Sequence, residues 1–230
     1  MPLHLVHGPP NSGRAGVVRE RFLAALGRDP ALVIPTLDDV FAFERELCAD
    51  RGALLGGSVL VFGGLFGEVA RATGEAPPET LTAAQRLCLV RAAIDRVELG
   101  PLRVSATRIG FAAALDELIG DLQSAGLTPE AVAGGSSTLE GSAYLDDLTA
   151  LYAAYAELRD SRGHADTHTV ARAAISALRQ DPDAWGGRPV LLYGFNDLTV
   201  EQLELIGALS VATEVTVSLT HEDRAALSDR

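Results

Sequence analysis

Residues 8–15, which read G-P-P-N-S-G-R-A, have the glycine spacing of a phosphate-binding loop. In the pattern G-x-x-x-x-G-K-[ST], backbone N–H groups surround the phosphates, the lysine reaches the β- and γ-phosphates, and the hydroxyl ligates Mg²⁺. Here Arg14 stands at the lysine position, and Ala15 cannot ligate a metal. We therefore predict a vestigial phosphate-binding loop, for which an ordinary strand-to-helix turn is the alternative. Its predicted contact residues are Gly8, Asn11, Ser12, Gly13 and Arg14.

The basic residues are all arginine, since none of the 19 Lys and Arg residues is a lysine. No other lysine can therefore replace the one missing from the loop, and Schiff-base chemistry by lysine is excluded. The formal net charge of −12 argues against a domain that coats nucleic acid over its whole surface. Any contact with DNA is expected to come from a local arginine patch.

The composition is typical of a globular protein, with 230 residues, 47% hydrophobic and 22% charged. The longest apolar runs are strand-sized and too short to span a bilayer. The N-terminus has no basic region followed by an apolar stretch, as a secretion signal would. Cys48 and Cys88 are isolated, which predicts neither a zinc site nor a disulfide framework. We expect a cytoplasmic protein with no metal site and no membrane contact.

Strands alternate with helices at both ends of the chain, which predicts a parallel sheet with right-handed crossovers. The predicted strands lie around residues 3–6, 31–36, 58–62, 189–193 and 213–219. The third of these is expected to close at Gly63 and Gly64. A helix is predicted to start at residue 38, and its apolar face is assigned to Val40, Phe41, Phe43 and Leu47.

Between about residues 80 and 180 only helices are predicted, at 83–97, 109–125, 142–159 and 167–179. Thr82 and Gln85 fit a capping box, and residues 133–137 are predicted to be a loop. The sequence therefore predicts an α/β fold with a parallel-sheet core at residues 1–72 and 188–221. Residues 73–187 are assigned to an all-helical insertion, and 222–230 to a tail at the cut end of a longer natural chain.

Two clusters of polar residues in this helical region are interpreted as structural. His164 and His168, with Asp166 between them, have the helical spacing of metal ligands. No third ligand is evident, so an exposed polar turn is predicted. The pair Asp146 and Asp147 precedes an apolar helical pattern and is interpreted as a cap at the start of a helix.

A phosphate loop, an α/β core and an all-helical insertion, in this order, are similar to the first motor domain of superfamily-1 helicases of the UvrD/RecB type. The succession of segments resembles more closely the amino-terminal part of AddB/RexB-type helicase–nuclease subunits. The matching segments are residues 8–14, 33–44, 60–65, 111–130, 145–155 and 193–199. The resemblance implies a P-loop NTPase-like core similar to helicase domain 1A and an insertion similar to domain 1B.

The resemblance also bears on hydrolysis. Active relatives end the corresponding strand in an Asp that holds Mg²⁺ and a Glu that orients the attacking water. This chain has Tyr193 and Gly194 there, followed by Asp197 and Gln202 in the degenerate Walker B region. Since the Walker A loop is degenerate as well, we do not expect ATP hydrolysis by this chain. No cofactor is expected beyond weak nucleotide binding.

The function that the resemblance implies is that of a scaffold in the repair and recombination of DNA double-strand breaks. The domain would guide single-stranded or duplex-end DNA and dock a motor-active helicase–nuclease subunit of the AddA/RecB type. A PD-(D/E)XK nuclease domain would lie further along the natural chain. Position alone makes the loop residues Thr36, Gly63 and Gly64, and the insertion residues Arg103 and Arg108, the candidates for DNA contact.

Two other functions remain open from the sequence. One is a nucleotide-binding regulatory domain or weak ATPase, in which Arg14 replaces the lysine and Asp197 is the nearest carboxylate. The other is a pure protein-interaction module, which the acidic charge favours.

Overall fold

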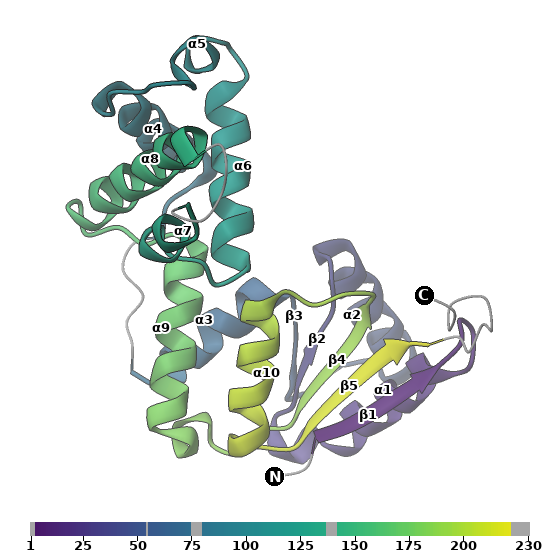
Figure 1. Cartoon of the computed structure of the whole chain (residues 1–230). Coiled ribbons are helices and arrows are strands. Elements are labelled where there is room, and N and C mark those ends of the chain that lie inside the picture. Colours follow the sequence, from purple (N-terminus) through teal and green to yellow (C-terminus); the bar gives the residue numbers. More distant parts are fainter. Residues whose placement is uncertain (1–2, 54, 75–79, 137–141, 222–230) are drawn as a thin grey trace. The chain divides into compact units, whose positions relative to one another are not determined.

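A computed structural model describes residues 3–53, 55–74, 80–136 and 142–221 (Figure 1). The chain forms two compact units. The first contains Met1–Glu75, Ala173–Leu198 and Gln202–Arg230, and the second contains Ala76–Arg172 and Thr199–Glu201. The domain boundaries drawn from the sequence stay predictions.

The first unit is built on a five-stranded, all-parallel sheet in the order β1-β5-β4-β2-β3, which confirms the predicted α/β class. The strands are β1 (Leu3–Gly8), β2 (Ala31–Val33), β3 (Ser58–Leu60), β4 (Val190–Phe195) and β5 (Val215–Thr220). The inner strands β2, β4 and β5 begin with consecutive buried residues, as expected of a sheet covered on both faces.

Helices cover both faces of this sheet (Figure 1). On one face lie α1 (Arg14–Ala24) and α2 (Leu37–Arg51), and on the other lie α3 (Phe62–Ala72), α9 (Thr167–Gln180) and α10 (Val200–Ala212). Short 3₁₀ turns occur at Leu26–Arg28 and Pro182–Trp185. Phe22 of α1 and Leu47 of α2 are fully buried against Leu32 and Leu191 of the sheet, and this cluster fixes both helices over the strands.

Three local predictions in this unit are wrong. The strand predicted at 31–36 ends at Val33, since Pro35 has no N–H to continue a ladder. Gly63 and Gly64 do not form a loop but lie in the first turn of α3, which begins at Phe62. Phe41 is 57% exposed, because α2 turns its apolar face to the sheet through Val40 and Leu47.

The second unit is helical among its described residues, apart from one parallel bridge between Thr80 and Ala165. Its helices are α4 (Ala83–Arg96), α5 (Arg103–Ala106), α6 (Phe111–Ser124), α7 (Pro129–Ser136) and α8 (Ser142–Asp160). The core joins α4, α6 and α8 through residues such as Val90, Ile119 and Tyr155. The capping box of Thr82 and Gln85 is confirmed at the start of α4.

Two predictions in the helical unit are corrected. Residues 133–136, predicted to be a loop, belong to α7, and residue 137 lies outside the described part of the chain. Asp147 lies inside α8 rather than at its start. Its carboxylate accepts hydrogen bonds from the backbone N–H groups of Gly100 (3.0 Å) and Leu102 (2.9 Å), so it holds the turn before α5.

Candidate functional site

The connections that leave neighbouring strands β4 and β2 run over opposite faces of the sheet. After β2 the chain continues into α2 on one face, and after β4 it continues into α10 on the other. Such a divergence leaves a crevice outside the carboxyl ends of the two strands, where open α/β sheets bind their ligands. The topology alone therefore marks this edge of the first unit as its candidate site.

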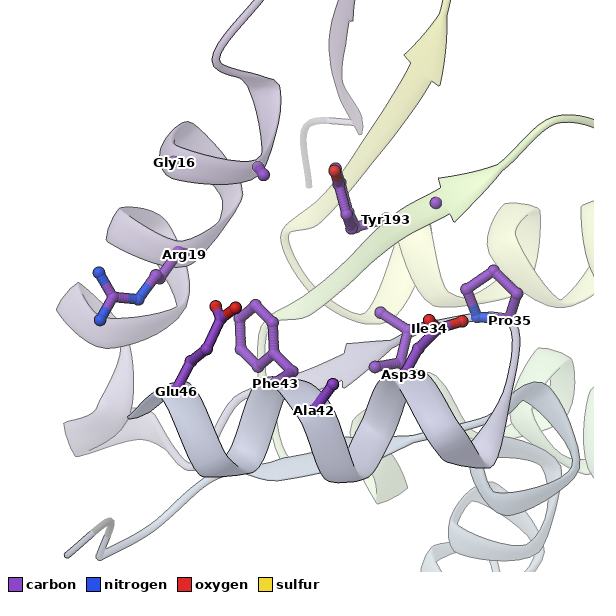
Figure 2. Close-up of a pocket in the computed structure, with 11 residues that line it drawn as sticks. Gly16, Arg19, Ile34, Pro35, Asp39, Ala42, Phe43, Glu46 and Tyr193 are labelled. Carbon is purple, nitrogen blue, oxygen red and sulfur yellow. The ribbon is translucent and has the colours of Figure 1, made fainter. Parts of the chain in front are cut away.

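A pocket of about 540 Å³ lies at this place (Figure 2). Tyr193 of β4 forms one side, and Phe43 of α2 lies on the facing side. Arg19 of α1 and Glu46 lie at one end, while Pro35 lies at the other. The complete lining is Ala15, Gly16, Arg19, Ile34, Pro35, Asp39, Ala42, Phe43, Glu46, Tyr193 and Gly194.

The predicted phosphate loop forms a second hollow of about 270 Å³, which shares Ala15 and Tyr193 with the first. The loop joins the end of β1 at Gly8 to the start of α1 at Arg14. Gly13 adopts a left-handed φ of 82° directly before the helix. A Cβ atom at Gly8 would lie 2.7 Å from the Ser12 hydroxyl oxygen and 3.3 Å from the Ser12 Cβ, so a larger residue there would displace the Ser12 side chain.

The loop offers fewer backbone donors than its spacing suggests. Pro9 and Pro10 have no N–H group, and the N–H of Ser12 donates to the carbonyl of Pro9 at 3.3 Å. The first turn of α1, from Arg14 onward, has N–H groups without partners in the helix, and these favour an anion. Anion binding by this loop would therefore depend on the helix start more than on the loop itself.

Arg14, at the position of the phosphate lysine, is held by strand β5. One of its terminal nitrogens donates to the Thr220 hydroxyl at 2.9 Å, and the other donates to Ser218 at 3.4 Å. A phosphate in the adjacent hollow would have to compete with these two hydroxyls for the guanidinium.

Hydrolytic relatives carry two carboxylates at the end of the strand that corresponds to β4. Here the second of these positions is Gly194, where the backbone excludes larger side chains. Gly194 has a φ of +89°, and a Cβ atom there would lie 3.1 Å from Cδ and 3.3 Å from Cγ of Pro35. Asp197 is exposed beyond the end of β4, and Gln202 lies in α10.

The candidates for DNA contact fall in separate places. Thr36 caps α2, since its hydroxyl oxygen accepts the N–H of Asp39 at 3.2 Å. Gly63 has open space around it in the first turn of α3. In the second unit, Arg103 begins α5 and Arg108 follows it. Both arginines are exposed, and Ile109 beside them has an exposed fraction of 102%.

A buried charge cluster surrounds Asp166, and the sequence does not predict it. The predicted exposed turn is wrong at this residue, whose exposed fraction is 1%. One carboxylate oxygen accepts hydrogen bonds from Gln123 (2.8 Å), Tyr155 (3.0 Å) and Arg159 (2.9 Å). The other accepts from the hydroxyl (2.8 Å) and N–H (2.7 Å) of Thr169. These bonds tie α6 and α8 to the start of α9.

Arg86 and Arg159 supply the positive charge of this cluster. Arg86 lies 3.6 Å from Asp166 and also pairs with Asp116. Burial raises the pKa of the Asp166 carboxyl, but the hydrogen bond from Gln123 and the charge of Arg159 outweigh this and lower it well below its ordinary value. Burial, together with the charge of Asp166, raises the pKa of Tyr155. Each of the hydrogen-bonding and charged groups named here finds its partner within the second unit. We therefore interpret the cluster as a structural clamp that holds α6, α8 and the start of α9 together.

The described residues contain no group of three metal-ligating side chains. Among them, no helix is long and apolar enough to cross a membrane. The model of a protein family described as "ADDB, N-terminal" matches residues 23–230, which leaves the loop at residues 8–15 outside the match. No curated protein matches the chain.

Proposed function

The chain belongs to the family of AddB N-terminal domains, and from this membership we propose that it is a helicase-like scaffold that does not hydrolyse ATP. AddB-type membership associates it with a DNA-repair helicase–nuclease, an AddA-type partner subunit and DNA. In the proposed role, the domain guides a single strand past the carboxyl ends of its sheet and docks the motor-active subunit.

The observation that carries the non-hydrolysing part is the backbone at the end of β4. Hydrolysis of this type needs one carboxylate for Mg²⁺ and another for the attacking water. Tyr193 supplies neither, and Gly194 is in a left-handed conformation against the ring of Pro35. Ala15 supplies no hydroxyl for the metal, and Arg14 is engaged by β5. Four positions of the active pattern thus lack the group that the reaction uses.

The DNA-guiding part is supported by a local excess of positive charge. Residues 99–115 contain Arg103 and Arg108 and no acidic residue, although the whole chain has a formal net charge of −12. Exposed arginines in such a segment can contact phosphates, and each such contact adds to the salt dependence of binding.

Replacing Arg103 and Arg108 together with glutamine is therefore expected to weaken binding of single-stranded DNA. The slope of log affinity against log salt should fall by about 1 for each phosphate that the variant no longer neutralises. The measurement is fluorescence anisotropy of a labelled strand at several salt concentrations. The matched control is Arg96→Gln, because Arg96 is exposed in the same unit but pairs with Glu157 at 2.8 Å. Equal slopes for the wild type and the double variant would show that these arginines do not contact the DNA backbone.

A nucleotide-binding enzyme is the second candidate, and the hollow over the start of α1 favours it. In that case Asp197, exposed just beyond β4, is the carboxylate that the sequence nominates for the reaction. This alternative predicts phosphate release from Mg·ATP that Asp197→Ala abolishes and Asp183→Ala, at an acidic residue of the 3₁₀ turn before β4, retains. The scaffold proposal predicts no release by any of the three proteins.

Docking of a motor subunit is a separate part of the proposal with its own test. Co-purification of the chain with an AddA-type subunit, in the presence of nuclease to remove DNA, is expected to recover a stable complex. If the chain binds single-stranded DNA but does not bind the AddA-type subunit, the docking part of the proposal is contradicted, and the DNA-guiding part is not.

A further inference from the structure

We propose that His7 and His221 form a site for one divalent transition-metal ion, such as Zn²⁺, Ni²⁺ or Cu²⁺, which joins the carboxyl ends of strands β1 and β5. The proposed function gives these two side chains no role, and the inference does not rest on DNA binding. The sequence predicts no metal site, because it shows no cluster of metal ligands close together in the chain. These two histidines come from opposite ends of the described chain and meet only in the fold.

The parallel pairing of β1 with β5 places the two rings on one face of the sheet. His7 is paired with Leu219, and His221 lies two residues beyond Leu219, so its side chain returns to the same face. The backbone N–H of His221 donates to the carbonyl of Gly8 at 2.9 Å, which continues the ladder past the end of β5. The backbones of both histidines are therefore held by the same two strands.

The separation of the two rings is close to the one that a shared ion requires. Their centroids lie 5.9 Å apart, with an angle of 78° between the ring planes. Zinc binds histidine nitrogens at about 2.0–2.1 Å in tetrahedral geometry, which puts the centroids of two imidazoles on one ion roughly 5–6 Å apart. Both side chains are exposed, so rotation about their side-chain bonds can turn one nitrogen of each ring toward a common ion.

The surroundings of the pair favour a transition metal over Mg²⁺ or Ca²⁺. The two histidines line a hollow of about 320 Å³ together with Leu5, Leu219 and Thr220. Among the described residues, no carboxylate lines this hollow. Imidazole is a ligand for Zn²⁺, Cu²⁺ and Ni²⁺, whereas Mg²⁺ and Ca²⁺ are bound through oxygen ligands. Since the site faces solvent, water would complete the coordination of the ion.

An ion at this place would add a link to the edge of the sheet. β1 is an edge strand, and among the described strands only β5 pairs with it (Figure 1). The two histidines are brought together only in the folded chain, so an ion that binds both stabilises the folded state against the unfolded one. Zn²⁺ should therefore raise the midpoint of thermal unfolding.

The test titrates the purified chain, free of any histidine tag, with Zn²⁺ and with Ni²⁺ by isothermal titration calorimetry. We expect one ion per chain. The affinity should fall at least roughly 10-fold in His7→Gln and in His221→Gln, because even the outer partners of metal ligands contribute that much to affinity. His4→Gln is the matched control and should bind as the wild type does, since His4 lies on the same strand with its side chain on the opposite face.

Electron paramagnetic resonance of the Cu²⁺-loaded chain counts the coordinated nitrogens. Two nitrogens in the wild type and one in either histidine variant support the shared site, whereas one nitrogen in the wild type overturns it. Two ions per chain, of which each variant loses one, would mean that the histidines bind separately and would also overturn it. So would the absence of binding, or an affinity that both variants retain. Both substitutions replace exposed side chains, so we expect the variants to fold.

Discussion

Replacing Asp166 with alanine is expected to lower the free energy of unfolding by about 3–5 kcal/mol, the cost of breaking a buried ion pair by removing one partner. Arg159 is 6% exposed and would keep its charge in the interior without the carboxylate that lies 2.9 Å away. The buried hydroxyl of Tyr155 and the amide of Gln123 would lose an acceptor at the same time. Urea unfolding followed by circular dichroism measures the difference.

The control for this variant is Asp160→Asn, which removes another partner of the same arginine. Asp160 lies 2.8 Å from Arg159, but its side chain is 63% exposed, and surface pairs contribute about 0–1 kcal/mol. Similar losses for the Asp160 and Asp166 variants would contradict the structural clamp. A loss below about 1 kcal/mol for Asp166→Ala would do so as well.

The pH dependence of the same cluster has a definite sign. The pKa of Asp166 is lower in the folded chain than its ordinary value, so the unfolded chain takes up the proton first as the pH falls. The stabilisation from this carboxylate is therefore complete above about pH 4 and is lost as the pH falls below that value. Asp166→Asn should show a shallower loss of stability in this range than the wild type.

Gly194→Glu is the second substitution for which we expect a large effect. It restores a carboxylate to the end of β4, yet it should destabilise the chain and restore no ATP hydrolysis. The φ of +89° costs a side-chain-bearing residue about 1–3 kcal/mol. The new Cβ would also lie 3.1 Å from the Pro35 ring, which adds a steric cost. Thermal or urea unfolding and phosphate release are the measurements.

Gly187→Glu separates the two causes. Gly187 has a similar φ of +68°, but nothing lies within 4 Å of a Cβ atom built there. It should therefore show the backbone cost alone and be less destabilising than Gly194→Glu. If the two variants unfold alike, the contact with Pro35 does not exclude a side chain from this position.

The sheet and its order of helices and strands follow from signals that are local in the sequence. Short apolar runs ended by Pro35 or by glycines predict the strands, and the intervening periodic segments predict the helices. The capping box of Thr82 and Gln85 is also local, since both of its hydrogen bonds join residues three apart. Strand order is not local, but right-handed crossovers limit it enough to predict the fold class.

The features that the sequence does not predict depend on residues far apart in the chain. Asp166 is buried because Gln123 and Arg159 from α6 and α8 reach it, whereas the sequence around it is typical of a polar turn. The partners of Arg14 lie on β5, about 200 residues away in sequence. The pocket lined by Tyr193 and Phe43 joins β4 to α2 in the same way. Spacing along one segment carries no information on such pairs.

The measurement that tests the central proposal most directly is a titration of labelled single-stranded DNA with the purified chain in Mg·ATP, with phosphate release recorded in the same sample. We predict binding that weakens as salt rises, together with no phosphate release above that of a protein-free control. Release that the strand stimulates would contradict the account, because it would require a hydrolytic site that Tyr193 and Gly194 cannot form.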